Sequence, residues 1–161
     1  MPKLYEKAVE IINRYFDTGA LLKIYHTETG SDKASALALH SPALPLSFFL
    51  EIELRTAMRA LRGRGAITEK ALNQLLECID QDIADGRLRK LSFDSAKVES
   101  KALNLSAKFT SQILCRSLDI IHVASALAAD IPTFVTGDKR QAQLAEAAGL
   151  EVEFIEIPRQ Q

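Results

Sequence analysis

Apolar residues along the chain fall into short β-branched or aromatic runs, separated by longer stretches with helical spacing. The short runs are bounded by Gly, Pro, Asp or Ser, as is typical of strands, and they lie at residues 14–16, 43–47, 88–93, 133–136 and 152–155. Residues repeating every three or four positions predict the helices between them. These helices are expected at residues 17–25, 31–39, 48–61, 68–85, 95–109, 118–128 and 139–148.

The resulting order, β-α-α-β-α-α-β-α-α-β-α-β with short connections, predicts the fold class. It favours one α/β domain with a mainly parallel sheet of about five short strands and helices on both faces. We place this domain at residues 14–157, after an N-terminal extension at 1–13 and before a tail at 158–161.

Three local details are also predicted. Ser31 is expected to cap the second helix. Thr110-Ser111 is expected to be irregular backbone that follows the 95–109 helix. In the 48–61 helix, one broad apolar face is expected from Phe49, Ile52, Ala57 and Leu61, joined by Leu50, Leu54 and Met58.

Composition and charge narrow the class of protein. The 161 residues are 47% apolar and 25% charged, which is typical of a soluble globular domain. Charged residues stand where a signal peptide would be apolar, and no apolar stretch reaches the roughly 18 residues of a membrane span, so we expect a cytoplasmic protein. The net charge of -1 does not indicate a protein that coats nucleic acid.

Three aspartates lie where predicted strands meet helices or where a helix begins: Asp17, Asp119 and Asp138. Each could cap a helix or favour its first turn. If the strands before Asp17 and Asp138 are neighbours, both carboxylates leave the same edge of the sheet, the usual place for a pocket in α/β folds.

Clustered carboxylates repel one another, and a divalent cation removes that repulsion. Mg²⁺ binds through a few carboxylates together with water and phosphate oxygens, and such cations assist phosphodiester cleavage. Cys78 and Cys115 lack the spacing of a zinc site and are expected to be small buried residues. No glycine-rich loop indicates a nucleotide.

The 48–61 helix adds further charges. Glu51 and Glu53 are about 200° apart around this helix, so only one of them can face a given pocket. Arg55, Arg59 and Arg62 form a basic stripe, which is either a solvated helix face or a contact for phosphates.

Four segments together resemble the PIN-domain nucleases, and within them the VapC-like toxins of bacterial and archaeal type II toxin-antitoxin pairs. The resemblance covers about residues 14–155. Its segments are Tyr15-Phe16-Asp17-Thr18, Glu53-Leu54-Arg55-Thr56-Ala57, Leu118-Asp119-Ile120-Ile121-His122-Val123-Ala124 and Thr136-Gly137-Asp138-Lys139-Arg140.

This resemblance implies a three-layer PIN-like fold and an endoribonuclease that depends on Mg²⁺ or Mn²⁺. It implies Asp17, Glu53, Asp119 and Asp138 as the catalytic and metal-binding acids, with a cation-held water attacking the phosphodiester. It also implies a homodimer and a small antitoxin that blocks the pocket.

Residues beside the acids carry supporting expectations. Thr18 and Thr136 match positions whose hydroxyls orient carboxylates. His122 shares a helical face with Asp119, and we expect it to be buried and hydrogen-bonded. Arg116 is expected to contact RNA phosphate or an antitoxin carboxylate, or to form a surface salt bridge.

Two features depart from the family pattern, and three competing interpretations stay open. Gly19 stands where a small polar residue is often found, and the N-terminal extension is longer than usual. Asp17-Thr18-Gly19 also matches the aspartic-protease triplet, although that fold is β-rich. A housekeeping PIN nuclease of RNA maturation and a catalytically silent PIN-like binding module are also compatible with the sequence.

Overall fold

The computed structural model describes residues 11–92 and 94–156. Its elements follow one another in the predicted order, which confirms the predicted α/β class. They are β1 (Arg14–Phe16), α1 (Thr18–Tyr25), α2 (Ser31–Leu39), β2 (Leu44–Leu46), α3 (Phe48–Gly63), α4 (Glu69–Ala84), β3 (Leu88–Lys90), α5 (Ser95–Ile113), α6 (Ser117–Ala128), β4 (Thr133–Thr136), α7 (Lys139–Ala147) and β5 (Glu151–Phe154). The expected extension at 1–13 and tail at 158–161 lie largely outside the described residues.

All described strand pairs are parallel, and β4 is the central strand of the order β1-β4-β5. The Arg14 guanidinium of β1 reaches past β4 and donates to both carboxylate oxygens of Glu153 in β5, at 2.7 and 3.0 Å. This forked ion pair ties the two outer strands together. Because β1 and β4 run side by side, Asp17 and the segment after Thr136 emerge at the same end of the sheet.

The five strands do not form one hydrogen-bonded sheet, unlike the prediction, because β2 and β3 make a separate pair. The backbone groups of Leu44 and Leu46 are bonded toward β3. Pro45 between them faces the other way, toward β1, and it has no N–H to donate. The middle of β2 therefore offers β1 no hydrogen-bond donor.

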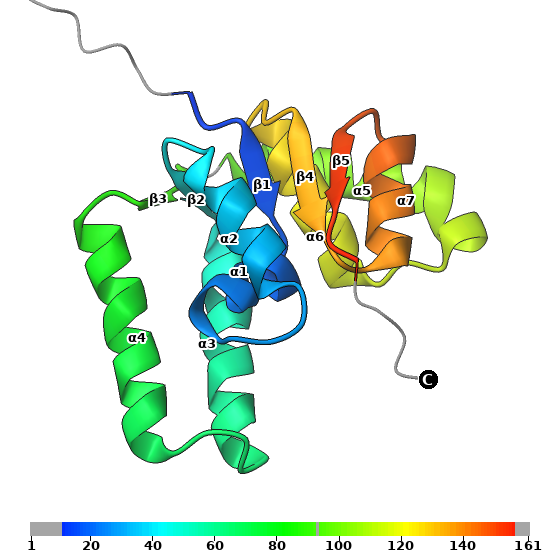
Figure 1. Cartoon of the computed structure of the whole chain (residues 1–161). Helices are drawn as coiled ribbons and strands as arrows, with labels where there is room; N and C mark the ends of the chain where they lie inside the picture. Colours follow the sequence, from blue (N-terminus) through cyan, green and yellow to red (C-terminus); the bar gives the residue numbers. More distant parts are fainter. Residues whose placement is uncertain (1–10, 93, 157–161) are drawn as a thin grey trace, which may run out of the picture.

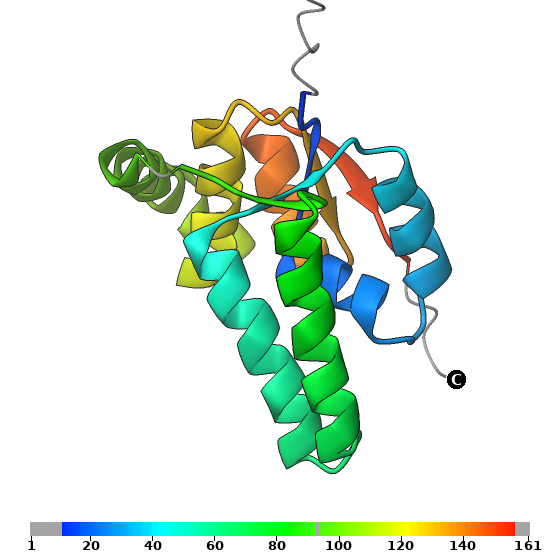
Figure 2. The ribbon, with the colours of Figure 1, turned by 90° about the vertical axis from the view of Figure 1, so that its left-hand side faces the viewer.

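Helices cover both faces of the β1-β4-β5 sheet, which gives three layers (Figures 1 and 2). Helices α1 and α2 lie on one face, whereas α6 and α7 lie on the other, with α5 packed outside α6. The core between the layers is built on large side chains with at most 1% exposure, including Tyr15, Phe16, Leu21 and Phe134.

Helices α3 and α4 pack side by side as a hairpin that projects from the body (Figures 1 and 2). The buried face of α3 is Leu50, Leu54 and Met58, which repeat every four residues. The broader face expected around Ile52 is wrong, since Ile52 is half exposed. Helix α3 packs against α1 on one side and against α4 on another. These contacts bury the stripe of Leu50, Leu54 and Met58, and Ile52 lies outside it.

Several smaller expectations are also corrected. Gly30, with φ of 91°, is the N-cap of α2, and Ser31 is its first helical residue. Helix α5 continues through Thr110 to Ile113 because it packs along α6, and it ends at Leu114 in the left-handed region. Cys115 is buried as expected, but Cys78 is exposed. Among the described residues, none of the helices has the length and apolarity to cross a membrane.

Candidate active site

A cavity of about 350 Å³ opens at the carboxyl ends of β1 and β4. It brings together all four acids expected from the sequence, which come from the end of β1, from α3, from α6 and from the start of α7. The lining residues are Asp17, Thr18, Gly19, Lys23, Glu53, Arg116, Asp119, His122, Gly137, Asp138 and Gln141.

Asp17 is the most enclosed of the acids, with 5% of its surface exposed. One carboxylate oxygen, Oδ1, caps α1 by accepting the Ala20 N–H, and the other, Oδ2, accepts the Thr136 hydroxyl in a very short contact. Burial raises the pKa of Asp17, an effect that these two hydrogen bonds only partly offset and that the nearby Asp138 charge reinforces. A positive charge in the cavity would therefore favour the ionised carboxylate.

Glu53 ends a chain of hydrogen bonds that runs out of the core. The Tyr15 hydroxyl lies 2.9 Å from both Ser47 Oγ and His122 Nδ1, and His122 Nε2 makes a very short contact with Glu53 Oε2. Each hydrogen has an acceptor if Ser47 donates to Tyr15, Tyr15 to His122 and His122 to Glu53. The His122 hydrogen bond lowers the pKa of Glu53, so this acid is held ionised.

Thr18 and His122 lie where the sequence predicted residues that orient the acids. The Thr18 hydroxyl donates to Glu53 Oε2 at 2.8 Å. His122 is 3% exposed, hydrogen-bonded on both ring nitrogens and in contact with Glu53, so it is buried as expected and also borders the cavity. The orientation of Glu53 thus depends on side chains from β1, α1 and α6.

Asp119 and Asp138 both act as helix caps. Asp119 Oδ2 accepts the backbone N–H of Arg116 at 3.0 Å, and the Arg116 guanidinium lies 3.4 Å from the same oxygen. Asp138 Oδ1 accepts the N–H groups of Arg140 and Gln141 at the start of α7. Capping uses one oxygen of each carboxylate and leaves the other.

Three carboxylate oxygens take part in no hydrogen bond or ion pair among residues 11–92 and 94–156. They are Glu53 Oε1, Asp119 Oδ1 and Asp138 Oδ2. Within the same ranges, no three His, Cys, Asp or Glu side chains are oriented so that together they could hold a metal ion. Glu53 is turned toward His122, and Asp119 is turned toward Arg116. The donor set nevertheless fits a hard divalent cation, because these are the anionic oxygens that Mg²⁺ prefers.

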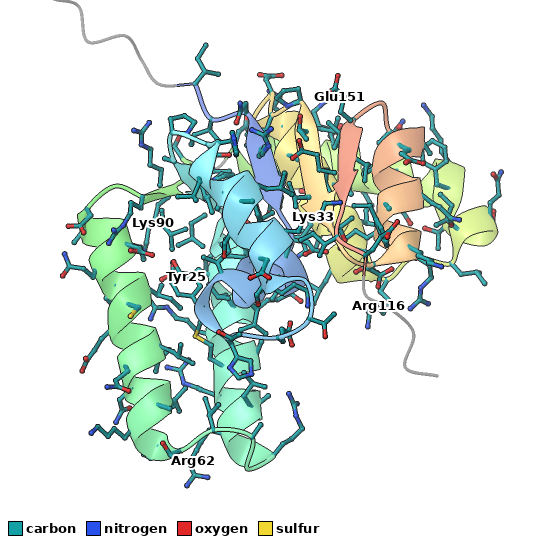
Figure 3. All side chains as sticks on the ribbon, in the orientation of Figure 1. Tyr25, Lys33, Arg62, Lys90, Arg116 and Glu151 are labelled. Carbon is teal, nitrogen blue, oxygen red and sulfur yellow. The ribbon has the colours of Figure 1, made fainter. Side chains whose placement is uncertain are left out.

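The basic stripe of α3 does not reach this cavity. Arg55 bridges Glu51 and Asp80 of α4, with an Nη2–Oδ1 distance of 2.6 Å to Asp80. Arg62 pairs with Glu69 and sits at the far tip of the hairpin, whereas Arg116 lies apart from it on the body of the molecule (Figure 3). Of the four predicted arginines, only Arg116 borders the acids.

Sequence reasoning missed two polar residues that line the cavity, Lys23 and Gln141. Lys23 is 7% exposed, and its Nζ lies 2.6 Å from Glu28 Oε1. Together with Arg116 it makes two Lys or Arg side chains in the lining. Both residues lie in amphipathic helical stretches, where a polar residue normally faces solvent. A Lys on the apolar side of the 17–25 helix was the one available signal.

The chain matches the family model described as PIN domain over residues 14–147. Two similar relatives are Ribonuclease VapC45 and Ribonuclease VapC49, from two strains of Mycobacterium tuberculosis, CDC 1551 / Oshkosh and H37Rv. Each is 34% identical over 140 residues, which cover 86% of this chain and 92% of the relative.

Two solved structures share the fold. FitAcB from Neisseria gonorrhoeae superposes with a TM-score of 0.63 at 18% identity, over 86% of this chain and 95% of that one. VapBC2 from Rickettsia felis, solved bound to a DNA fragment from its promoter, superposes with a TM-score of 0.62 at 17% identity. The match covers 88% of this chain and 97% of that one.

Proposed function

This chain belongs to the PIN-domain family, and on that premise we propose that it is a VapC-type ribonuclease whose four cavity acids bind a divalent cation. The proposed ligands are Asp17, Glu53, Asp119 and Asp138, and the cation is Mg²⁺ or Mn²⁺. The substrate is RNA.

One observation carries this proposal: four carboxylates from four separate elements line one cavity where parallel strands end. Burying acids together is unfavourable unless a cation or protons compensate the charge. The cationic side chains of the lining compensate this charge only in part, since Lys23 is paired with Glu28, outside the acid set, and the one ion pair of Arg116 among the described residues is with Asp119. An aspartic protease, by contrast, is inconsistent with this α/β fold.

When bound, the cation would supply a positive charge that activates a water molecule and offsets the charge developing on the phosphate. The residues of the chain prepare the site for it. His122 and Thr18 hold Glu53, and Thr136 holds Asp17. Glu53 and Asp119 each keep one carboxylate oxygen free of hydrogen bonds and ion pairs among the described residues, and these oxygens would be available to the cation. Arg116 lines the cavity and would hold a phosphate of the RNA.

The test compares two glutamates on the same helix. Glu53→Gln removes one proposed ligand, whereas Glu51→Gln changes a carboxylate that pairs with Arg55 and Lys90 outside the cavity. We expect RNA cleavage that EDTA abolishes and Mn²⁺ or Mg²⁺ restores, a loss of about 100-fold or more in Glu53→Gln, and wild-type cleavage in Glu51→Gln. Cleavage that is insensitive to EDTA, or equal in the two variants, would contradict the assignment.

We further propose that the protein is the toxin of a toxin-antitoxin pair, that it forms a homodimer, and that an antitoxin protein covers the cavity. The likeness to VapC proteins over most of the chain supports this. Expression without the antitoxin should arrest growth of the host cell, and the Asp119→Asn variant should relieve the arrest. Unaffected growth with an active, folded enzyme would instead favour a housekeeping nuclease.

A further inference from the structure

One buried side-chain atom stands out at the wall of the acidic cavity. Gln141 lines the cavity and is 3% exposed. Among the described residues, its Nε2 is the single buried side-chain nitrogen or oxygen without a hydrogen-bond partner. Since buried polar groups are nearly always paired, this amide needs an explanation.

The position of Gln141 in α7 suggests a capping box, but the structure uses another group for that purpose. Gln141 is the third residue of the helix after its N-cap, Asp138, and a capping box would have its side chain accept the Asp138 N–H. That N–H instead donates to Thr136 Oγ1 at 3.0 Å. The Gln141 side chain is therefore available for another role, and its Oε1 lies 3.4 Å from the same Thr136 oxygen.

The hydrogen-bonding capacity of Thr136 decides how the amide is turned. A threonine hydroxyl has one hydrogen and two lone pairs. Its hydrogen goes to Asp17 in the very short contact, and one lone pair accepts from Asp138. Thr136 therefore has no second hydrogen to donate to another acceptor such as Oε1 of Gln141. The amide nitrogen in that place would donate to the remaining lone pair.

Oxygen and nitrogen of an amide are nearly the same size, so their assignment follows from the hydrogen-bond network. With the amide turned, Gln141 donates to Thr136 and Thr136 donates to Asp17. The buried atom without a partner then becomes Oε1 in place of Nε2, and an unpaired buried C=O is less rare than an unpaired buried N–H. Asp17 would be held by a directed chain, as Glu53 is held by Tyr15 and His122.

We propose that Gln141 is a positioning residue of the cation site: its amide donates a hydrogen bond to Thr136, and the Thr136 hydroxyl in turn fixes the Asp17 carboxylate. The hydrogen of the Thr136 hydroxyl is then directed to Asp17, so this buried carboxylate is held in one orientation for the cation. This inference rests on the proposed divalent-cation site and assigns the residue that orients its most buried acid.

The experiment measures Mn²⁺ affinity by calorimetry in the full chain without RNA. Gln141→Met keeps the length of the side chain but removes both hydrogen-bonding atoms, and Gln143→Met is its control on the exposed side of the same helix. We expect roughly tenfold weaker Mn²⁺ binding in Gln141→Met and wild-type binding in Gln143→Met. The melting temperature in EDTA should change little, because the variant loses one weak hydrogen bond to Thr136 and at the same time removes an unpaired buried polar atom.

A double-mutant cycle with Thr136→Val separates positioning from a merely structural role. If Gln141 acts through Thr136, its replacement should weaken Mn²⁺ binding much less in the Thr136→Val background than in the wild type. Additive losses would overturn the proposed hydrogen-bond relay from Gln141 through Thr136 to Asp17. Wild-type Mn²⁺ affinity in Gln141→Met would overturn it as well. If Gln141→Met does not fold, Gln141→Leu replaces it in the same cycle. A wild-type protein that binds no Mn²⁺ would overturn the cation site itself, an outcome distinct from failure of the Gln141 role alone.

Discussion

The cavity and the α3–α4 hairpin are both rich in charged side chains, and α3 contributes to each of them. In the hairpin the charges are matched at the surface: Arg55 pairs with Glu51 and Asp80, and Arg62 with Glu69. In the cavity four acids gather around two cationic side chains, one of which pairs with Glu28 outside the acid set.

This difference teaches how to separate structural from functional charge in the molecule. Exposed ion pairs contribute little and are lost with little effect. An unmatched, partly buried group of like charges costs stability and is typical of a site for a ligand or a reaction. The contrast leads to four predictions, each of which sets the cavity against the hairpin or one wall of the cavity against the other.

The largest effect is expected on cleavage. Asp119→Asn removes a cavity carboxylate and Asp80→Asn a hairpin carboxylate, which is 66% exposed. Loss of a metal ligand should lower the rate of RNA cleavage by more than about 100-fold, whereas Asp80→Asn should leave it within about twofold because it affects a surface ion pair alone. Both rates are measured on one RNA substrate at saturating Mn²⁺. Equal losses would remove the distinction between the two regions.

The next effect is on thermal stability. A cation that binds only the folded protein stabilises it by about 2.7 kcal/mol at a hundredfold excess over Kd. For a chain of this size, that amounts to an increase of roughly 5–10 °C in the melting temperature. We expect this increase for the wild type and Asp80→Asn, and little of it for Asp17→Asn. An equal increase in Asp17→Asn would show that Mn²⁺ binds elsewhere.

Asp17 and Glu53 should show opposite pH dependence in EDTA. Burial raises the pKa of Asp17, so its contribution to stability is present below the unfolded value of about 3.9 and is lost as pH rises through the folded pKa. The His122 hydrogen bond lowers the pKa of Glu53, so its contribution is present above about 4.3 and is lost as pH falls through the folded pKa.

Melting curves from about pH 2 to 8 test these signs, because the Glu53 contribution is lost only below its unfolded pKa of about 4.3. Asp17→Asn keeps an oxygen to cap α1, so it should be at least as stable as the wild type at neutral pH and lose this advantage near pH 4. Glu53→Gln should be less stable than the wild type at neutral pH and approach it in acid. The same sign for both variants would contradict the two environments described for these acids.

The smallest effect is expected from the arginines of the hairpin. The Arg59→Ala, Arg62→Ala double variant should bind RNA within about twofold of the wild type, because neither residue lines the cavity. Arg116→Ala should bind more weakly at low salt, with the slope of log K against log salt reduced by about 0.7 for one lost phosphate contact. A larger change in slope for the double variant would place RNA along α3.

The order of elements could be predicted because local signals agreed with the final packing. Asp17 and Asp138 cap the helices that follow them, as their side-chain types suggested. Helix geometry allowed only one of Glu51 and Glu53 to face the pocket, and the family pattern favoured Glu53. The structure has Glu53 in the cavity lining and Glu51 paired with Arg55 outside it.

What could not be predicted depended on contacts distant in sequence. The partner of Arg55 is Asp80, on a helix whose alignment with α3 is set by packing. The exposure of Ile52 and the separation of β2 from β1 likewise depend on which neighbours each element meets. Gln141 gave no signal because a glutamine near a helix start has an ordinary explanation, and only its burial beside Thr136 makes it unusual.

The position of β4 in the middle of its sheet has a consequence for synthesis of the protein. Arg14–Phe16 must wait for Thr133–Thr136 before it can pair, and β5 follows later still. Contacts this far apart in sequence form late, after the loop between them has closed. A nascent chain on the ribosome would therefore lack the assembled acids until nearly all of it had emerged. A nuclease built in this way would cleave no RNA during its own translation.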